Sequence, residues 1–304
     1  MNMGIPNPHD RFFKETLSVK ENALDFVSGV LPETLREKLD LSTLNIEPTS
    51  YVDNKLAESF SDIVYSCTFK HAAVVKISLL LEHKSSPDPY PHIQLLKYIT
   101  NIWDQLRKQQ RKPQIGIPIV LYHGKKRWRK GDMTSYFKES DNEFCRFIPS
   151  FEYILLDLSK YTHEQIKEGI FNRTAVKMWL LLQKHIFDTK RLERYLSDLL
   201  KLGILYYREP EGLRFLESVC RYIFFATDLE TEIVLQAAQQ IPEGGRELIM
   251  TTGEKLLKQG FEQGIEHAKL EDARKMIESG YRIEDICDIT NLSKEIVETL
   301  KKQK

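Results

Sequence analysis

Two carboxylates and a lysine, Asp62, Glu82 and Lys84, lie in two neighbouring segments that have the character of β-strands. Asp62 is near the start of the run SDIVYSCTFK, and Glu82 and Lys84 end the run VVKISLLLEHK. Side chains on a strand alternate between its two faces, so Glu82 and Lys84 share a face. An acid on one strand, followed by Glu-x-Lys at the end of the next, is typical of a metal-dependent nuclease site.

A short turn near Ala72 would join the two strands into a hairpin, with Asp62 opposite or nearly opposite Glu82. Facing Cβ atoms lie about 4.5–5.5 Å apart, and two ionised carboxylates that close repel unless a cation lies between them or one binds a proton. Mg²⁺ prefers oxygen ligands and commonly uses one or two carboxylates with substrate phosphate. Lys84 would orient an attacking water or neutralise charge that develops on the phosphate. A solvated charge pair at a strand end explains Glu82 and Lys84 as well.

Five segments, taken together and in this order, resemble the recombination-promoting nuclease family: HDRFFKETLS, ESFSDIVY, LLLEHKSSPD, QLLKY and GIPIVLYHG. That family, also described as YhgA-like transposases, is placed in the PD-(D/E)xK nuclease superfamily. The segments cover roughly the first half of the chain, and they are specific as a set although each alone is not. The resemblance implies that Asp62 and Glu82 hold the metal and that Lys84 is the third catalytic residue. Many relatives carry Gln where Lys84 stands.

The resemblance also points to two helices. Gln94 lies at the start of a segment with helical spacing of apolar residues, about 92–110. Superfamily relatives place a Gln or Tyr there near the active centre, so Gln94 is a further catalytic candidate and Tyr98 a secondary one. A first helix is expected from about residue 7 to residue 27. Its His9 and Asp10 belong to the family motif, although helix capping explains them equally well, and its Glu15 could join the metal site.

Positive charge is concentrated in one stretch, although the formal net charge of the chain is zero. Residues 97–130 contain ten Lys and Arg against a single acid, Asp104. A basic patch with an aromatic ring suits the backbone and bases of a nucleic acid, because released counterions drive binding and rings can stack. Trp128 supplies such a ring within KKRWRK, whereas a solvated helix end and loop would have the same composition. The candidate nucleic-acid-binding residues are Lys125, Lys126, Arg127, Arg129 and Lys130.

The remaining pattern predicts an α/β fold, and the resemblance implies a restriction-endonuclease-like PD-(D/E)xK core in which helices flank a central mixed sheet. Further strands are expected at 44–52, 115–121 and 153–159. The run 115–121 is apolar throughout, as in a strand covered on both faces, but Pro118 favours an edge strand or a bulge. From Thr162 onward the periodicity is helical, and Ser293 is expected to cap the last helix.

Three regions are therefore expected: a nuclease-like core (1–160), a helical extension packed on it (161–250), and a helical tail (251–304) that would serve oligomerisation or form a small helix-turn-helix-like element. The superfamily often works as dimers, because one site cuts one strand, which implies a homo-oligomer. The composition, 41% hydrophobic and 29% charged, is that of a globular protein. The sequence has no apolar run of membrane-spanning length, no export signal and no CxxC spacing among its four cysteines, so a cytoplasmic protein is expected.

The function expected from these features is that of a Mg²⁺-dependent DNA endonuclease, whose strand breaks promote recombination or transposition. A catalytically silent DNA-binding module and a protein-interaction module on the same fold are the alternatives. The presence of Asp62, Glu82 and Lys84 together favours the enzyme, because a silent module does not need all three.

Overall fold

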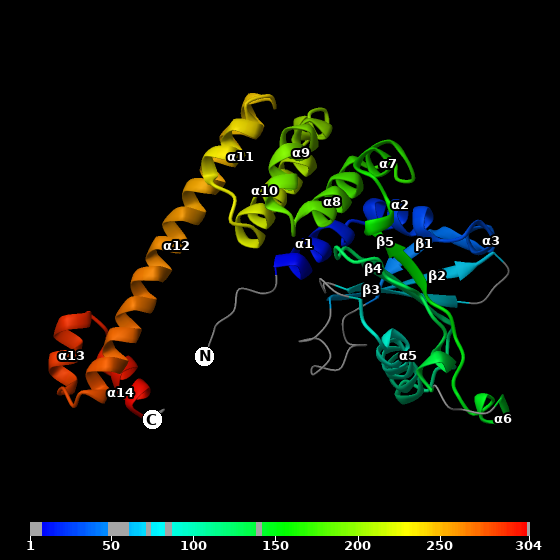
Figure 1. The fold of residues 1–304 in the computed structure, drawn as a ribbon, viewed down its shortest axis with the longest axis horizontal. Coiled ribbons are helices and arrows are strands. Elements are labelled where there is room, and N and C mark those ends of the chain that lie inside the picture. Colours follow the sequence, from blue (N-terminus) through cyan, green and yellow to red (C-terminus); the bar gives the residue numbers. More distant parts are fainter. Residues whose placement is uncertain (1–7, 48–60, 71–73, 83–86, 138–141, 303–304) are drawn as a thin grey trace. The chain divides into compact units, whose positions relative to one another are not determined.

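A five-stranded mixed sheet forms the centre of the first of two compact units in this computed structural model (Figure 1). The structure describes residues 8–47, 61–70, 74–82, 87–137 and 142–302, and for residues 61, 62, 74–82, 142, 256, 257, 259–263 and 267 it describes the backbone alone. The strands are β1 (Leu39–Ile46), β2 (Ser61–Phe69), β3 (Val74–Glu82), β4 (Gly116–Tyr122) and β5 (Ile154–Asp157). They lie in sequence order, antiparallel from β1 to β3 and parallel from β3 to β5.

Helices make up most of the rest of the chain. Those up to β5 are α1 (Pro8–Leu17), α2 (Lys20–Val30), α3 (Glu33–Arg36), α5 (Pro91–Lys108) and α6 (Asn142–Cys145), with the 3-10 helix η2 (Met133–Tyr136). After β5 follow η3 (Leu158–Lys160), α7 (His163–Glu168), α8 (Thr174–His185), α9 (Thr189–Leu202), η4 (Tyr206–Arg208), α10 (Pro210–Ala226), α11 (Thr231–Ala238), α12 (Glu243–Glu278), α13 (Ile283–Thr290) and α14 (Lys294–Lys302). The predicted α/β class with a helical C-terminal region is confirmed.

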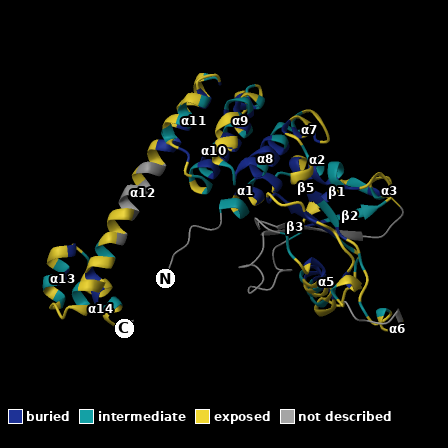
Figure 2. Ribbon diagram, in the orientation of Figure 1, coloured by how far each residue is buried: buried dark blue, intermediate teal, exposed yellow. Residues whose placement is uncertain are grey.

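The two faces of the sheet are covered by different helices. Val64, Val120 and Tyr122 pack under α5, whereas Ile63 and Tyr65 belong to the large core beneath α1, α2 and α8 (Figures 1 and 2). Consecutive strand residues enter opposite cores because their side chains alternate. The parallel connection from β3 to β4 needs a crossover, and α5 provides it.

The predicted first helix, 7–27, is instead two helices, α1 and α2, separated at Ser18 and Val19. Asn22 Nδ2 donates to the carbonyl oxygen of Thr16 at 3.0 Å, and Tyr65 Oη donates to that of Leu17. These bonds satisfy carbonyl groups that a broken helix leaves without intrahelical partners. Since Tyr65 comes from β2, the break depends on a tertiary contact that helix periodicity does not reveal.

Pro118 lies inside an interior strand, so the prediction of an edge strand is wrong. β4 pairs with β3 on one side, where Pro118 is opposite Ser78, and with β5 on the other. The pairing with β5 begins only at Ile119. The missing N–H of proline is tolerated because, on the β5 side, β4 has no pairing partner at position 118. The first strand is also shifted, from the expected 44–52 to Leu39–Ile46, and residues beyond 47 in that range lie outside the described residues.

A buried histidine pair joins α7 to α8 and α9. His163 Nε2 lies 3.2 Å from Asp198 Oδ2, and His163 Nδ1 lies 3.1 Å from His185 Nε2. Burial and the charges of His163, Lys184 and Arg191, partly opposed by Asp188, together lower the pKa of His185 to about 4. His185 is therefore neutral in the folded protein at pH 7.

We expect the free energy of unfolding to fall as the pH drops from about 6.5 to about 4. Because His185 has a lower pKa in the folded state than in the unfolded state, the unfolded chain binds more protons in this window. The loss attributable to this residue approaches about 3 kcal/mol, measured by urea unfolding at several pH values. His185→Gln should flatten the profile in the window. Asp198 has a lowered pKa, so its own titration lies below this pH window. An unchanged pH profile of stability in His185→Gln would therefore contradict the assignment of the loss to His185.

The second compact unit, residues 250–304, contains most of α12 together with α13 and α14. Ala273, Ile286 and Val297 form its small core, one residue from each helix. The predicted cap at Ser293 is confirmed, because Ser293 Oγ accepts from the Ile296 N–H at 3.4 Å. Among the described residues, no helix is both long enough and apolar enough to cross a membrane.

Candidate active site and nucleic-acid surface

The backbone pairing of β2 with β3 fixes how positions 62 and 82 are related. Asp62 lies opposite Leu80 and Ser61 opposite Leu81, so Glu82 is two residues beyond the direct partner of Asp62. Positions 62, 80 and 82 share one face of the sheet because the ladder alternates in steps of two. Diagonal neighbours of this kind are about 7–8 Å apart, a separation across which two carboxylates can share one cation. Lys84 lies outside the described residues.

Glu82 ends β3 at an edge where three parallel strands stop together. It pairs with Tyr122, the last residue of β4, which pairs with Asp157, the last residue of β5. Neighbouring strands lie about 4.8 Å apart, so this row carries the candidate metal ligand, an aromatic ring and a second acid over three strands. The loops that follow β4 and β5 therefore start close to Glu82.

Asp157 holds the loop after β4 in place. Its side chain is 1% exposed, Oδ2 accepts from the Trp128 N–H at 3.1 Å, and Oδ1 accepts from the Ser159 N–H at 2.9 Å. Both carboxylate oxygens of Asp157 are thus used by backbone donors. Sequence reasoning missed this residue, although an acid that ends an apolar run and precedes Leu-Ser is a recognisable capping signal.

α5 covers the face of the sheet that contains positions 62 and 82. Val64 and Val120, which lie on the same face, pack against Leu95 and Tyr98 of α5. Gln94 is in the first turn of this helix and half-buried, and Tyr98 follows one turn later and is 3% exposed. The structure thus places both α5 candidates on the helix that overlies the carboxylate face. Gln94 stays a prediction as a catalytic residue.

The loop after β4 exposes its cations and buries its tryptophan. Lys125, Lys126, Arg127, Arg129 and Lys130 are all exposed. Trp128 is 2% exposed, its Nε1–H donates to Tyr153 Oη at 3.2 Å, and its ring contacts that of Tyr122 edge-on at 5.0 Å. The interpretation of Trp128 as a stacking platform for a base is wrong, because its ring is part of the core that holds the loop down.

An exposed ring, Tyr90, and a half-buried one, Tyr136, nevertheless lie beside this loop. Arg127 and Arg129, with Tyr90 and Tyr136, line an open hollow of about 480 Å³ whose other wall is the segment 87–91, just before α5. The two tyrosine rings meet edge-to-face at 5.1 Å, and Tyr90 is 52% exposed. Burial lowers the pKa of His92, whose Nδ1 lies 2.6 Å from Tyr136 Oη. A neutral His92 therefore accepts a hydrogen bond from Tyr136 and fixes its ring.

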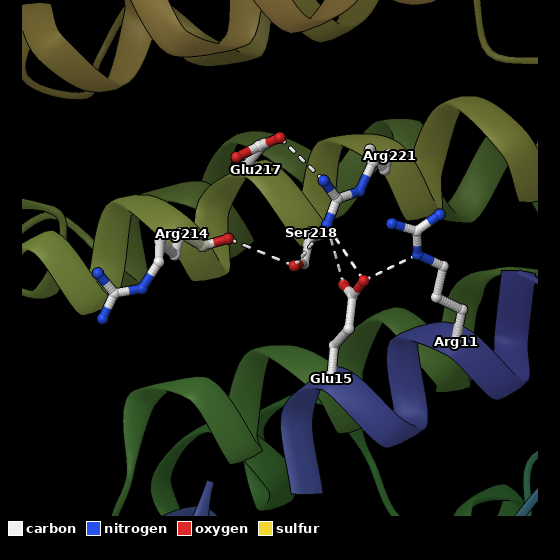
Figure 3. A network of polar contacts seen from close by, with 6 residues as sticks. All are labelled: Arg11, Glu15, Arg214, Glu217, Ser218 and Arg221. Carbon is white, nitrogen blue, oxygen red and sulfur yellow. Dashed lines mark hydrogen bonds and ion pairs between the residues drawn. The ribbon is translucent and has the colours of Figure 1, made fainter. Parts of the chain in front are cut away.

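Two other family-motif residues on α1 have structural partners. Glu15 Oε1 accepts from Arg11 Nε at 2.8 Å, and Arg221 Nη2 of α10 lies 3.1 Å from Glu15 Oε2 (Figure 3). Burial alone would raise the pKa of Glu15, but bonds from Ser218 and Arg11 and the charge of Arg221 lower it. Glu15 thus stabilises the packing of α1 against α10, which explains it without a metal. His9 Nδ1 lies 2.7 Å from Tyr222 Oη.

The donors at positions 62 and 82 suit a hard divalent cation, because both are carboxylates. Among the residues described with their side chains, no cluster of three or more His, Cys, Asp or Glu could hold a metal.

Three known proteins of Escherichia coli are similar to this chain over most of its length. RpnA of Escherichia coli K12, named a recombination-promoting nuclease, is 26% identical over 293 residues, which are 95% of this chain and 95% of that protein. RpnD of E. coli O157:H7, with the same description, is 27% identical over 84% of this chain and 96% of its own length. RpnE of E. coli K12, named an inactive recombination-promoting nuclease-like protein, is 25% identical over 94% of this chain and 95% of its own length.

No solved structure matches the chain significantly. The model of the family described as "Putative transposase, YhgA-like" matches residues 7–213. This match includes the whole sheet, α5 and the basic loop, and it covers more than half of the chain. The chain therefore belongs to the YhgA-like transposase family.

Proposed function

We propose that this protein is a metal-dependent DNA endonuclease whose strand breaks promote recombination or transposition. The observation that carries the proposal is the β2–β3 register, which puts positions 62 and 82 on one face where β3 ends. The names of RpnA and RpnD as recombination-promoting nucleases support the activity. The mixed sheet, with an antiparallel β2–β3 pair and α5 as the crossover to β4, supports a PD-(D/E)xK core.

In this proposal Asp62 and Glu82 hold Mg²⁺ or another divalent cation. The bound cation would supply a Lewis acid that polarises the scissile phosphate and neutralises part of its charge. Lys84 orients the attacking water or stabilises charge on the phosphate, and Gln94 positions the reacting groups from α5. Cleavage of both strands needs two sites, so a homo-oligomer is part of the proposal.

The basic loop would bind the DNA backbone. Its five exposed cations start three residues after β4, next to the strand that ends at Glu82. Arg127 and Arg129 line the same hollow as Tyr90 and Tyr136, which gives phosphate-binding guanidinium groups beside rings that can stack on an unpaired base. This arrangement supports DNA as the substrate.

The test is incubation of supercoiled plasmid with the full-length protein in Mg²⁺ or Mn²⁺ and, separately, in excess EDTA. We expect nicked and linear products only with the divalent ion. DNA binding without cleavage in either ion would overturn the enzyme and support the silent DNA-binding module, which the "inactive" in the name of RpnE favours as the second candidate. Absence of both binding and cleavage would leave a protein-interaction module.

Removing the charges of Arg127 and Arg129 together should weaken DNA binding and its dependence on salt. Each lost phosphate contact lowers the slope of log K against log salt by about 0.9, so the double Gln variant should lose nearly 2. The slope is measured by fluorescence anisotropy with a labelled duplex, at salt concentrations from about 50 to about 200 mM. The control, Lys190→Gln with Lys201→Gln, removes two exposed cations of α9. Equal slopes in the two double variants would exclude a specific role for the loop.

A further inference from the structure

A second cavity, of about 240 Å³, lies at the carboxyl ends of β4 and β5. Three segments build it: the residues directly after β4, those directly after β5, and the stretch from the last turn of α8 to the first turn of α9. Its lining is His123, Gly124, Lys125, Leu158, Ser159, Lys184, Phe187, Asp188 and Arg191. In open sheets with parallel strands, ligands commonly bind outside the carboxyl ends of the strands.

The charged lining is strongly positive. Lys125, Lys184 and Arg191 contribute three positive charges, and Asp188 contributes the one negative charge. Asp188 is engaged as the N-cap of α9, where its Oδ1 accepts from the Arg191 N–H at 3.1 Å. The net charge of plus two therefore has no counterpart among the lining residues.

Lys184 is held in an unfavourable position for a cation. It is half-buried in the last turn of α8, and its Nζ donates a hydrogen bond to the carbonyl oxygen of Leu158 at 2.9 Å. Burial lowers the pKa of Lys184, the charge of Arg191 lowers it further, and Asp157 partly opposes this. An anion in the cavity would relieve the repulsion between Lys184 and Arg191 and compensate the loss of water around Lys184.

The remaining lining suits a small, doubly charged oxyanion. The guanidinium of Arg191 can bind two oxygens at once, the ammonium groups of Lys125 and Lys184 act as point charges, and the hydroxyl of Ser159 can donate. The cavity is smaller than the usual range for drug-sized ligands, about 300–1,000 Å³. A phosphate monoester carries about −1.5 to −2 charge at pH 7, which matches the net positive charge of the lining.

We propose that this cavity binds a phosphate group. Binding does not require cleavage, so the inference goes beyond the proposed nuclease activity and does not depend on it. The phosphate could be free in solution or could be the 5′-terminal phosphate of a nucleic acid strand, since both present the same oxyanion.

The test measures binding to the full-length protein by isothermal titration calorimetry at constant ionic strength. The probes are inorganic phosphate and a short oligodeoxynucleotide with either a 5′-phosphate or a 5′-hydroxyl. The variants are Lys125→Gln and Arg191→Gln, both exposed residues whose side chains leave the core intact. Lys190→Gln is the matched control, because it removes an exposed cation from the same end of α9 without lining the cavity.

We expect saturable binding of phosphate by the wild type, weakened about tenfold in each cavity variant and within twofold of wild type in Lys190→Gln. If the wild type binds the 5′-phosphorylated oligonucleotide at least about tenfold more tightly than the 5′-hydroxyl one, and Arg191→Gln loses this preference, the site binds a strand terminus. Binding of inorganic phosphate without that preference assigns it to a free phosphate. No saturable binding of any probe, or equal weakening by all three substitutions, would overturn the proposal.

Discussion

Replacing Asp62 by Asn, or Glu82 by Gln, should lower the rate of metal-dependent plasmid cleavage at least about a hundredfold. Under the proposed function these two carboxylates hold the cation, and a bound cation supplies several kcal/mol of transition-state stabilisation, with each 1.36 kcal/mol equal to a factor of ten in rate. The amide side chains keep the size of the originals and remove the charge. Initial rates of nicking at saturating Mg²⁺ provide the measurement.

Two controls separate catalysis from folding and binding. Glu193→Gln removes an exposed carboxylate of α9 and should leave the rate unchanged. DNA affinity of the Asp62 and Glu82 variants, measured in EDTA, should equal or exceed that of the wild type, because a negative charge near the phosphates has been removed. A variant at either position that retains more than a tenth of the wild-type rate would contradict a metal site built from these two residues.

The sequence predicts the relative position of Asp62 and Glu82 to within two residues of strand register. Strand alternation correctly predicts that positions 62 and 82 share a face, because the period of two is a property of every strand. The register itself depends on where the turn lies, and sequence alone left Asp62 either opposite Glu82 or close to it. The observed pairing with Leu80 makes the relation diagonal.

The errors in the sequence-based predictions come from contacts between distant segments. The break between α1 and α2 is stabilised by Tyr65 from β2, and Pro118 is tolerated in β4 because β5 starts pairing one residue later. The error on Trp128 has the same cause, because a ring among five cations has the composition of a surface loop, and its contacts with Tyr122 and Tyr153 come from distant segments. Local patterns do not record which strand or helix a residue meets.

The loop that carries the candidate DNA-binding cations depends on one buried carboxylate. Asp157 ends β5, and its two oxygens accept from the N–H groups of Trp128 and Ser159. Trp128 lies between Arg127 and Arg129, so the bond from its N–H fixes the backbone at the middle of the cluster. The position of Asp157 therefore helps to place Arg127 and Arg129 at the hollow with Tyr90 and Tyr136.

Asp157→Asn should lower both the free energy of unfolding and the affinity for DNA. The amide oxygen of Asn can still accept from one of the two backbone N–H groups, but its NH2 group faces the other. That second backbone N–H is then buried without an acceptor, which costs about 1–3 kcal/mol. Urea unfolding gives the stability, and anisotropy with a labelled duplex gives the affinity, which we expect to fall several-fold as the loop loses its anchor.

The sign of the change in DNA affinity distinguishes anchoring from simple electrostatics. Removing a negative charge near a basic loop should by itself strengthen binding to a polyanion. Asp132→Asn makes the same charge change at an exposed position close to the loop, so its affinity should stay equal or rise, whereas that of Asp157→Asn should fall. If Asp157→Asn binds DNA as tightly as Asp132→Asn and unfolds at the same urea concentration as the wild type, Asp157 does not anchor the loop. In that case contacts other than those of Asp157 would fix the conformation of the basic loop.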